Sequence, residues 1–126
     1  SSHYGVFYPL QSLRKEKVEL PDIPVFIDAS DSKAKEVLGK LATSVSKKNM
    51  IVASENDRQK LHVAAVVVSN FVNHLYVLAE EYCKKEGLDF QQLVPLIEET
   101  ALRIKTTAPT QSQTGPAARN DEPTII

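Results

Sequence analysis

The stretch SENDRQKLHVAAVVVSNFVNHLYVLAEEYCKKEG, residues 54–87, decides the fold of this chain. Ser54, with Asp57 three residues later, is typical of a helix N-terminus, because both side chains can satisfy unpaired backbone N–H groups. Gly87 is well placed to end the helix in the left-handed conformation. The stretch therefore predicts one helix of about 30 residues, on the order of 45 Å long.

This helix is too long and too apolar to be covered by the rest of the chain, so we expect it to pack on further helices or on a second subunit. Its apolar middle also carries polar side chains. At roughly 100° per residue, His62, Ser69 and Asn73 fall within about 40° of one another. Such a stripe either satisfies a buried hydrogen-bond network or lines a cleft. The sequence leaves both interpretations open.

Composition limits the function classes. The 126 residues have 42% hydrophobic and 25% charged side chains, typical of a single globular domain, and a net charge of −1. This charge gives no electrostatic reason to expect nucleic acid or an anionic membrane as a partner. The basic pair Arg14–Lys15 is expected to be solvated surface. Cys83, the single cysteine, excludes an intrachain disulfide and fits a reducing cytoplasm.

Short elements precede the long helix. Residues 5–8 and 24–28 are predicted strands, residues 33–46 an amphipathic helix, and residues 49–53 a third strand. The continuous apolar run at 24–28 indicates a strand buried on both faces, as in a parallel sheet. This order predicts the tail of an α/β sheet whose first part is absent. We expect no apolar run of membrane-spanning length, because charges interrupt the long helix at both ends.

The segment after Gly87 is expected to be helical and then extended. Asp89 is a predicted cap, and Pro95 divides the following stretch into a short turn and a helix. Residues 107–126 are rich in Pro, Thr and Gln and are predicted to be loop-like. The chain begins without methionine and stops on two isoleucines, so we expect a fragment of a longer protein.

Three motifs in order indicate a family: YPLQS at 8–12, LHVAA at 61–65 leading to SNF at 69–71, and TGPAARND at 114–121. Together they resemble the C-terminal half of Rossmann-like NADP oxidoreductases with a helical C-terminal domain of unsettled function. These are relatives of pyrroline-5-carboxylate reductase and of deazaflavin-dependent NADP oxidoreductases. The resemblance implies an α+β fragment, in which the tail of a Rossmann-like sheet precedes an all-α domain. That domain, built on one long helix, resembles the C-terminal class of 6-phosphogluconate dehydrogenase.

The resemblance also implies a division of roles. Residues 1–53 would be the end of an NAD(P)-binding domain that lacks its Gly-rich turn, and residues 54–126 a helical substrate and dimerisation domain without its final helices. It implies NADP as the cofactor of the complete protein, a small-molecule substrate, and a homodimer formed through the long helix. The fragment alone is expected to be inactive. The alternative is a non-catalytic helical module that only dimerises.

Site residues follow from the same resemblance. Pro9, Gln11 and Ser12 lie in a turn after a strand, where open α/β sheets bind ligands, and would face the nicotinamide. Tyr8 stands where the family usually has histidine, which puts proton transfer at this position in doubt. His62 matches the family's helix histidine, and an imidazole there can bind a substrate carbonyl or shuttle a proton. The bland alternative is a core histidine.

The remaining candidates concern substrate and metal. Asn73 is a second catalytic candidate, whereas Ser69, Asn70, Thr114 and Arg119 are candidates for substrate binding. Arg119 offers a planar fork for a carboxylate or phosphate, or else an internal ion pair. The asparagines would orient a substrate carbonyl or bridge two helices. No metal site is predicted, because the long helix has no second histidine at ligand spacing on the face of the first.

Overall fold

The computed structural model describes residues 2–16, 22–46 and 50–113. Its internal contacts divide the chain into two compact units, Ser1–His74 and Leu75–Ile126. The first unit contains the sheet and the start of the long helix, and the second contains the remaining helices. Each unit is described by itself.

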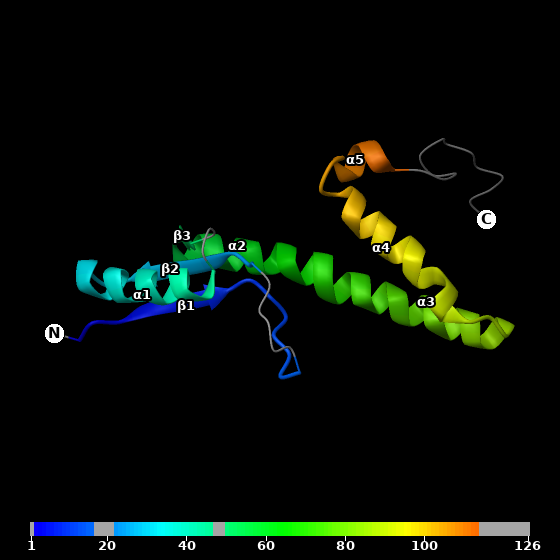
Figure 1. Ribbon diagram of the computed structural model, residues 1–126, viewed down its shortest axis with the longest axis horizontal. Helices are drawn as coiled ribbons and strands as arrows, with labels where there is room; N and C mark the ends of the chain where they lie inside the picture. The colour runs from blue at the N-terminus through cyan, green and yellow to red at the C-terminus, as the bar shows by residue number, and fades with distance from the viewer. Residues whose placement is uncertain (1, 17–21, 47–49, 114–126) are drawn as a thin grey trace. The chain divides into compact units, whose positions relative to one another are not determined.

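The first unit holds a three-stranded mixed sheet with the order β1-β2-β3 (Figure 1). β1 (Gly5–Pro9) runs antiparallel to β2 (Val25–Ala29), and β2 runs parallel to β3 (Met50–Val52). Helix α1 (Ser32–Val45) connects β2 to β3. The predicted order of strand, strand, helix and strand is therefore confirmed. Strand β1 extends one residue beyond its prediction, because Pro9 still pairs with Val25.

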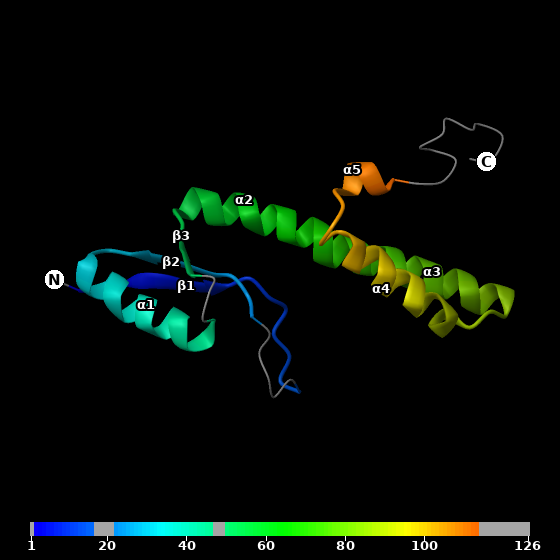
Figure 2. The same ribbon diagram turned by 45° about the horizontal axis from the view of Figure 1, so that its top comes forward.

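The core of this unit lies between the sheet and α1, which runs alongside the strands in both ribbon views (Figures 1 and 2). Val25 and Ile27 of β2 are almost completely buried, and Ala42 of α1 packs against them. Burial alternates along β2, with Phe26 only half-buried. The expectation of a strand buried on both faces is therefore wrong for the described residues, because α1 covers only the face of Val25 and Ile27 and leaves the face of Phe26 partly exposed.

Asp31 fixes the start of α1. Its side chain accepts hydrogen bonds from the backbone N–H groups of Lys33 and Ala34, both at 3.0 Å, and its other oxygen contacts His3 and Ser30. The hydrogen bond from Ala34, followed by those from His3 and Ser30, holds the pKa of Asp31 well below its ordinary value of 3.8. Because the folded state prefers the charged carboxylate, this contribution to stability is lost as the pH falls.

We therefore predict that Asp31→Asn reduces the pH dependence of folding. Asparagine still accepts the two backbone hydrogen bonds of the cap but cannot be protonated in this range. As the pH is lowered below about 5, the free energy of unfolding of the wild type should decrease, because the Asp31 carboxyl binds a proton in the unfolded state at a higher pH than in the folded state. Urea titrations near pH 7 and pH 3 should show a smaller difference for the variant. An equal difference in both proteins would contradict this role.

The long helix is continuous from Glu55 to Glu86 but is not uniformly α-helical. It consists of α2 (Glu55–Val66), a π-helical segment η1 (Val67–Phe71) and α3 (Val72–Glu86). The ends are as predicted, since Ser54 accepts from the Asp57 N–H and Gly87 has a φ of 71°. The prediction of one long helix is therefore confirmed, and within it an i→i+5 hydrogen-bond pattern replaces i→i+4 at η1.

Arg58 ties the start of this helix to the sheet. Its guanidinium donates to Asp28 Oδ2 at 3.0 Å and to the carbonyl of Ala53 at 2.6 Å, and its side chain is only 13% exposed. The hydrogen bond from Arg58 lowers the pKa of Asp28 below its ordinary value. Asp28 of β2 therefore positions the start of α2, which carries the candidate residue His62.

The second unit contains the rest of α3 and three short helical elements. A 3₁₀ turn, η2 (Phe90–Leu93), is capped by Asp89, and α4 (Val94–Arg103) follows with a proline in its first turn. This confirms the predicted cap and the division at Pro95. A four-residue helix, α5 (Pro109–Ser112), occupies part of the segment predicted to be extended.

The long helix is more apolar than we expected from the charges at its two ends. The 32-residue stretch Glu55–Glu86 includes an 18-residue window with a mean hydropathy of 1.5. By length and composition alone it can cross a membrane, so the expectation that no run approaches that length is wrong. The valines and leucines outweigh the polar side chains between them, and the charges lie at the ends. A core helix of a soluble protein passes the same test.

Candidate functional site

Two adjoining hollows in the first unit bring the turn after β1 next to the long helix. The first, of about 520 Å³, lies between residues 8–12 and residues 61–70. Its walls are largely apolar, with Leu10, Leu61 and Val68 among them. The second, of about 790 Å³, has only polar lining residues: Gln11, Ser12, Arg14, Ser69, Asn70 and Asn73. The motif turn and the helix stripe, distant in sequence, therefore share one site.

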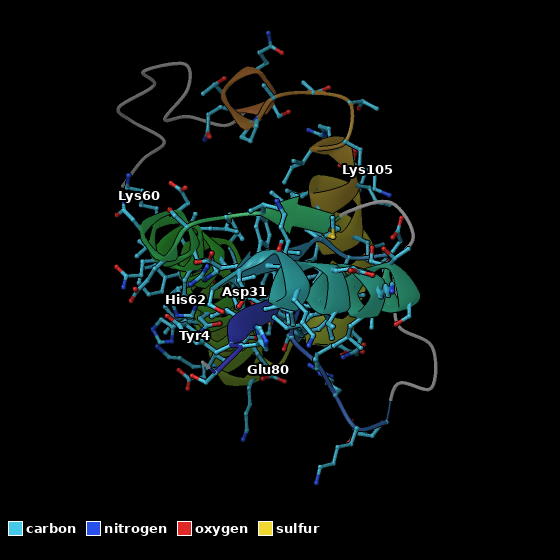
Figure 3. All side chains as sticks on the ribbon, turned by 90° about the vertical axis from the view of Figure 1, so that its left-hand side faces the viewer. Tyr4, Asp31, Lys60, His62, Glu80 and Lys105 are labelled. Carbon is cyan, nitrogen blue, oxygen red and sulfur yellow. The ribbon has the colours of Figure 1, made fainter. Side chains whose placement is uncertain are left out.

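Tyr8 and His62 meet at the edge of the first hollow. The phenol oxygen of Tyr8 lies 3.3 Å from Nδ1 of His62, and both side chains line the hollow. Figure 3 shows His62 on α2, on the side of the helix next to β1. In the neutral tautomer protonated on Nε2, Nδ1 accepts from the phenol and Nε2–H can donate to a ligand. In the tautomer protonated on Nδ1, the ring donates to the phenol oxygen and Nε2 accepts, and when the ring is protonated both nitrogens donate. The pair can therefore present a proton donor to a ligand in the hollow.

The tyrosine at position 8 is itself held in place. Its ring lies 6.3 Å from the ring of Phe26 on the neighbouring strand, in a tilted arrangement. From the sequence, a role of this position in proton transfer was in doubt, because Tyr8 replaces the family's usual histidine. The structure places its hydroxyl as the partner of His62, a contact across 54 residues of sequence that spacing within the helix could not reveal.

The π-helical segment carries the middle of the site. Ser69 and Asn70 both lie in η1 and line both hollows. A π-helical turn is less stable than an α-helical one and is often found at functional sites. Ser69 and Asn73, four residues apart, lie on neighbouring positions of the same face. The predicted stripe therefore lines open hollows, and the interpretation as a dry buried network is wrong for Ser69, Asn70 and Asn73, which are exposed.

The predicted residues do not all gather at one point. Asn73 lines only the polar hollow, whereas His62 lines only the apolar one of this pair. Eleven residues separate them, which corresponds to about 16 Å along a helix axis. The two catalytic candidates are therefore not a single catalytic pair. Pro9, Gln11 and Ser12 lie where the turn meets the helix, and their roles stay predictions.

Three further points concern the candidate residues. Thr114 and Arg119 lie outside the described residues. Arg14, which was interpreted as solvated surface, lines the polar hollow although its side chain is exposed. The one sequence feature that could have indicated this position of Arg14 is that a basic residue follows the YPLQS turn closely. In the described part of the chain, no group of three His, Cys, Asp or Glu side chains is arranged to hold a metal ion.

Comparison with known proteins gives the following relatives. No curated protein matches the chain. The crystal structure of a "putative NADP oxidoreductase" from Bacteroides fragilis matches 98% of the chain with 43% identity and a TM-score of 0.90. A protein of Thermotoga maritima matches 96% of the chain with 27% identity and a TM-score of 0.80. The chain covers 48% and 50% of these two proteins, so it spans about half their length.

These matches confirm the resemblance inferred from the three motifs and the predicted fold class. The strand, strand, helix and strand pattern followed by a long helix is shared with the structure named a "putative NADP oxidoreductase". A family profile, described as a domain of unknown function (DUF2520), matches residues 23–126. Because this match spans most of the sequence, the chain belongs to the DUF2520 family.

Proposed function

We propose that the complete protein is an NADP-dependent oxidoreductase and that this chain forms the substrate-side wall of its cleft. The observation that supports this most strongly is the similarity to the Bacteroides fragilis protein over 98% of the chain. The second support is the site itself, in which a histidine and a tyrosine border an apolar hollow. An apolar pocket with few convergent polar groups is the usual form of a small-molecule site.

The helix start that follows β2 does not fit the phosphates of a dinucleotide. Such phosphates usually bind at a Gly-rich turn that opens a helix, where free backbone N–H groups point at the anion. Here α1 follows β2, but the carboxylate of Asp31 already occupies the N–H groups of Lys33 and Ala34. A negative charge at this position repels a phosphate. In the proposal, NADP is therefore held by parts of the protein other than this helix start.

The contribution of this chain would be orientation and proton transfer. A nicotinamide cofactor supplies the hydride in such reactions. Reduction of a carbonyl also needs a proton on its oxygen, and in the proposal the imidazolium of His62, which lines the apolar hollow, donates this proton and becomes neutral imidazole. Tyr8 would fix the orientation of the ring through its bond to Nδ1. Pro9, Gln11 and Ser12 would then border the nicotinamide from the turn.

A cofactor titration tests this function. The intact protein should bind NADPH saturably, measured as quenching or enhancement of the dihydronicotinamide fluorescence. Parallel titration with NADH establishes the preference between the two cofactors, because the phosphate distinguishes them. Absence of saturable binding of either cofactor would overturn the proposal. The 126-residue chain alone should bind neither tightly, since its helix start is occupied by Asp31.

A second function, dimerisation through the long helix, is favoured by its exposed apolar side chains. Val68 is 72% exposed and Phe71 is 60% exposed, and Leu75 of the second unit is 61% exposed. Exposed apolar side chains of this density mark interaction surfaces. We propose a second copy as the partner, not a membrane or nucleic acid, in a cytoplasmic protein. For the alternative function, a non-catalytic helical module that dimerises, this exposed apolar surface would be sufficient.

We predict that Val68→Asp weakens this dimer. A carboxylate in an apolar interface loses its hydration without gaining a partner, which costs several kcal/mol. Sedimentation velocity of the intact protein should show a dimer for the wild type and mainly monomer for the variant. Lys60→Asp, an exposed charge change in α2, is the control and should remain dimeric. Unchanged sedimentation of Val68→Asp would show that the dimer, if formed, uses another surface.

A further inference from the structure

The two hollows of the first unit form one elongated space with chemically different ends. They share four lining side chains, those of Gln11, Ser12, Ser69 and Asn70. Tyr8 and His62 border only the apolar part, whereas Arg14 and Asn73 border only the polar part. A ligand that fits both parts must combine an apolar body with a strongly polar group.

We propose that Arg14 binds the carboxylate of the substrate in the polar hollow, and that the substrate's apolar body lies in the neighbouring hollow toward His62. The proposal rests on the proposed function, because it takes the apolar hollow as the place where the substrate reacts. It adds the chemical class of the substrate, an acid with an apolar body, and a binding residue outside the motifs.

The side chains of the polar hollow suit an anion. Among the residues that the structure describes, no acidic side chain lines it, and Arg14 contributes the one positive charge. The other lining groups are amides and hydroxyls, all of which can donate hydrogen bonds. The amide oxygen of Gln11 already accepts from the N–H of Ser12 at 2.9 Å, which leaves the Gln11 nitrogen for donation. These donors line the same hollow as Arg14, whose planar guanidinium matches a carboxylate.

A carboxylate fits this hollow better than a phosphate. A phosphate carries up to two negative charges, and its sites usually combine several cations or the free N–H groups of a helix N-terminus. The described lining residues supply one cation, and Ser69, Asn70 and Asn73 lie within the long helix, where backbone N–H groups are used by helical hydrogen bonds. One guanidinium therefore balances one carboxylate.

The spacing of the two ends sets the length of the substrate. Asn70, which lines both hollows, follows His62 by eight residues, or about 12 Å along the helix axis, and Asn73, which lines only the polar hollow, follows it by eleven, or about 16 Å. A ligand that reaches from the polar group near Asn70 to the imidazole therefore needs a body on the order of 10 Å. Acids of two or three carbons are too short. A straight chain of eight carbons is long enough to serve as a probe.

The test compares octanoate with octanol, which has the same chain without the charge. Isothermal titration calorimetry on the intact protein should show that octanoate binds at least about tenfold more tightly, as is typical when a charged hydrogen bond is added. In Arg14→Gln the two probes should bind equally. Lys15→Gln is the matched control, because it removes the adjacent positive charge from a side chain that does not line the hollow. It should retain the octanoate preference.

The outcomes separate this proposal from the proposed function. Equal affinity of octanoate and octanol for the wild type, or a preference that persists in Arg14→Gln, would overturn the carboxylate site. If Arg14→Gln instead weakens NADPH and leaves octanoate unchanged, the hollow binds a cofactor phosphate and the proposal is also wrong. Failure of the wild type to bind NADPH, with an octanoate preference that depends on Arg14, would refute the oxidoreductase and leave the acid site standing.

Discussion

Replacing His62 with glutamine is expected to lower kcat of the proposed reduction by roughly 10²- to 10⁴-fold, the usual contribution of a positioned acid or base. Glutamine can still hydrogen-bond to the phenol of Tyr8, which lies 3.3 Å from Nδ1 in the wild type. It cannot deliver a proton to the substrate oxygen. The loss should therefore occur in the chemical step, with the dissociation constant for NADPH unchanged.

Two further variants make this prediction specific. His74→Gln removes the other histidine of the long helix, which is exposed and lines neither hollow, and its kcat should equal that of the wild type. Tyr8→Phe removes the orienting hydroxyl but keeps the imidazole, so its loss should be smaller than that of His62→Gln. A wild-type kcat in His62→Gln would show that the imidazole is structural and not a proton donor.

Replacing Ile27 with alanine is expected to lower the free energy of unfolding by about 3 kcal/mol, within the range of 2–5 kcal/mol for such truncations in a core. Ile27 is 1% exposed and packs in the cluster formed by β2 and α1. The shorter side chain loses apolar burial and leaves a cavity that the strand cannot close, because β1 and β3 hold β2 on both sides.

Ile51→Ala provides the matched control for this stability measurement. Ile51 lies on the adjacent strand β3 and is 44% exposed, so the same deletion should cost less than half as much. Urea denaturation should show a lower midpoint for Ile27→Ala with an unchanged slope. Equal losses in the two variants would mean that the sheet is covered on the side of Ile51 as well, and that the described core is incomplete.

The elements of this fold were largely predictable because their signals are local. A cap such as Ser54 satisfies N–H groups within three residues of itself, and Gly87 ends the helix through its own φ angle. Apolar periodicity likewise reports on one helix or strand at a time. The order of elements and the fold class followed from these signals and from the three motifs.

The candidate site was only partly predictable. The stripe of Ser69 and Asn73 could be read from helical spacing, and both side chains line the polar hollow. Arg14 could not be identified, because its place depends on the path of a loop that has no periodicity. The π-helical turn at η1 also has no simple sequence signature, since the same valines and asparagine suit a regular α-helix.

The sequence by itself determined the order and the approximate bounds of most helices and strands of the described chain, because caps, prolines, glycines and apolar spacing act over a few residues. Only the tertiary structure decided which side chains meet. The contact of Tyr8 with His62, and the presence of Arg14 and Asn73 at one hollow, require β1, its following turn and the long helix to be held together, to which the Arg58–Asp28 contact contributes. Contacts of that kind depend on packing between distant segments, which no local pattern encodes.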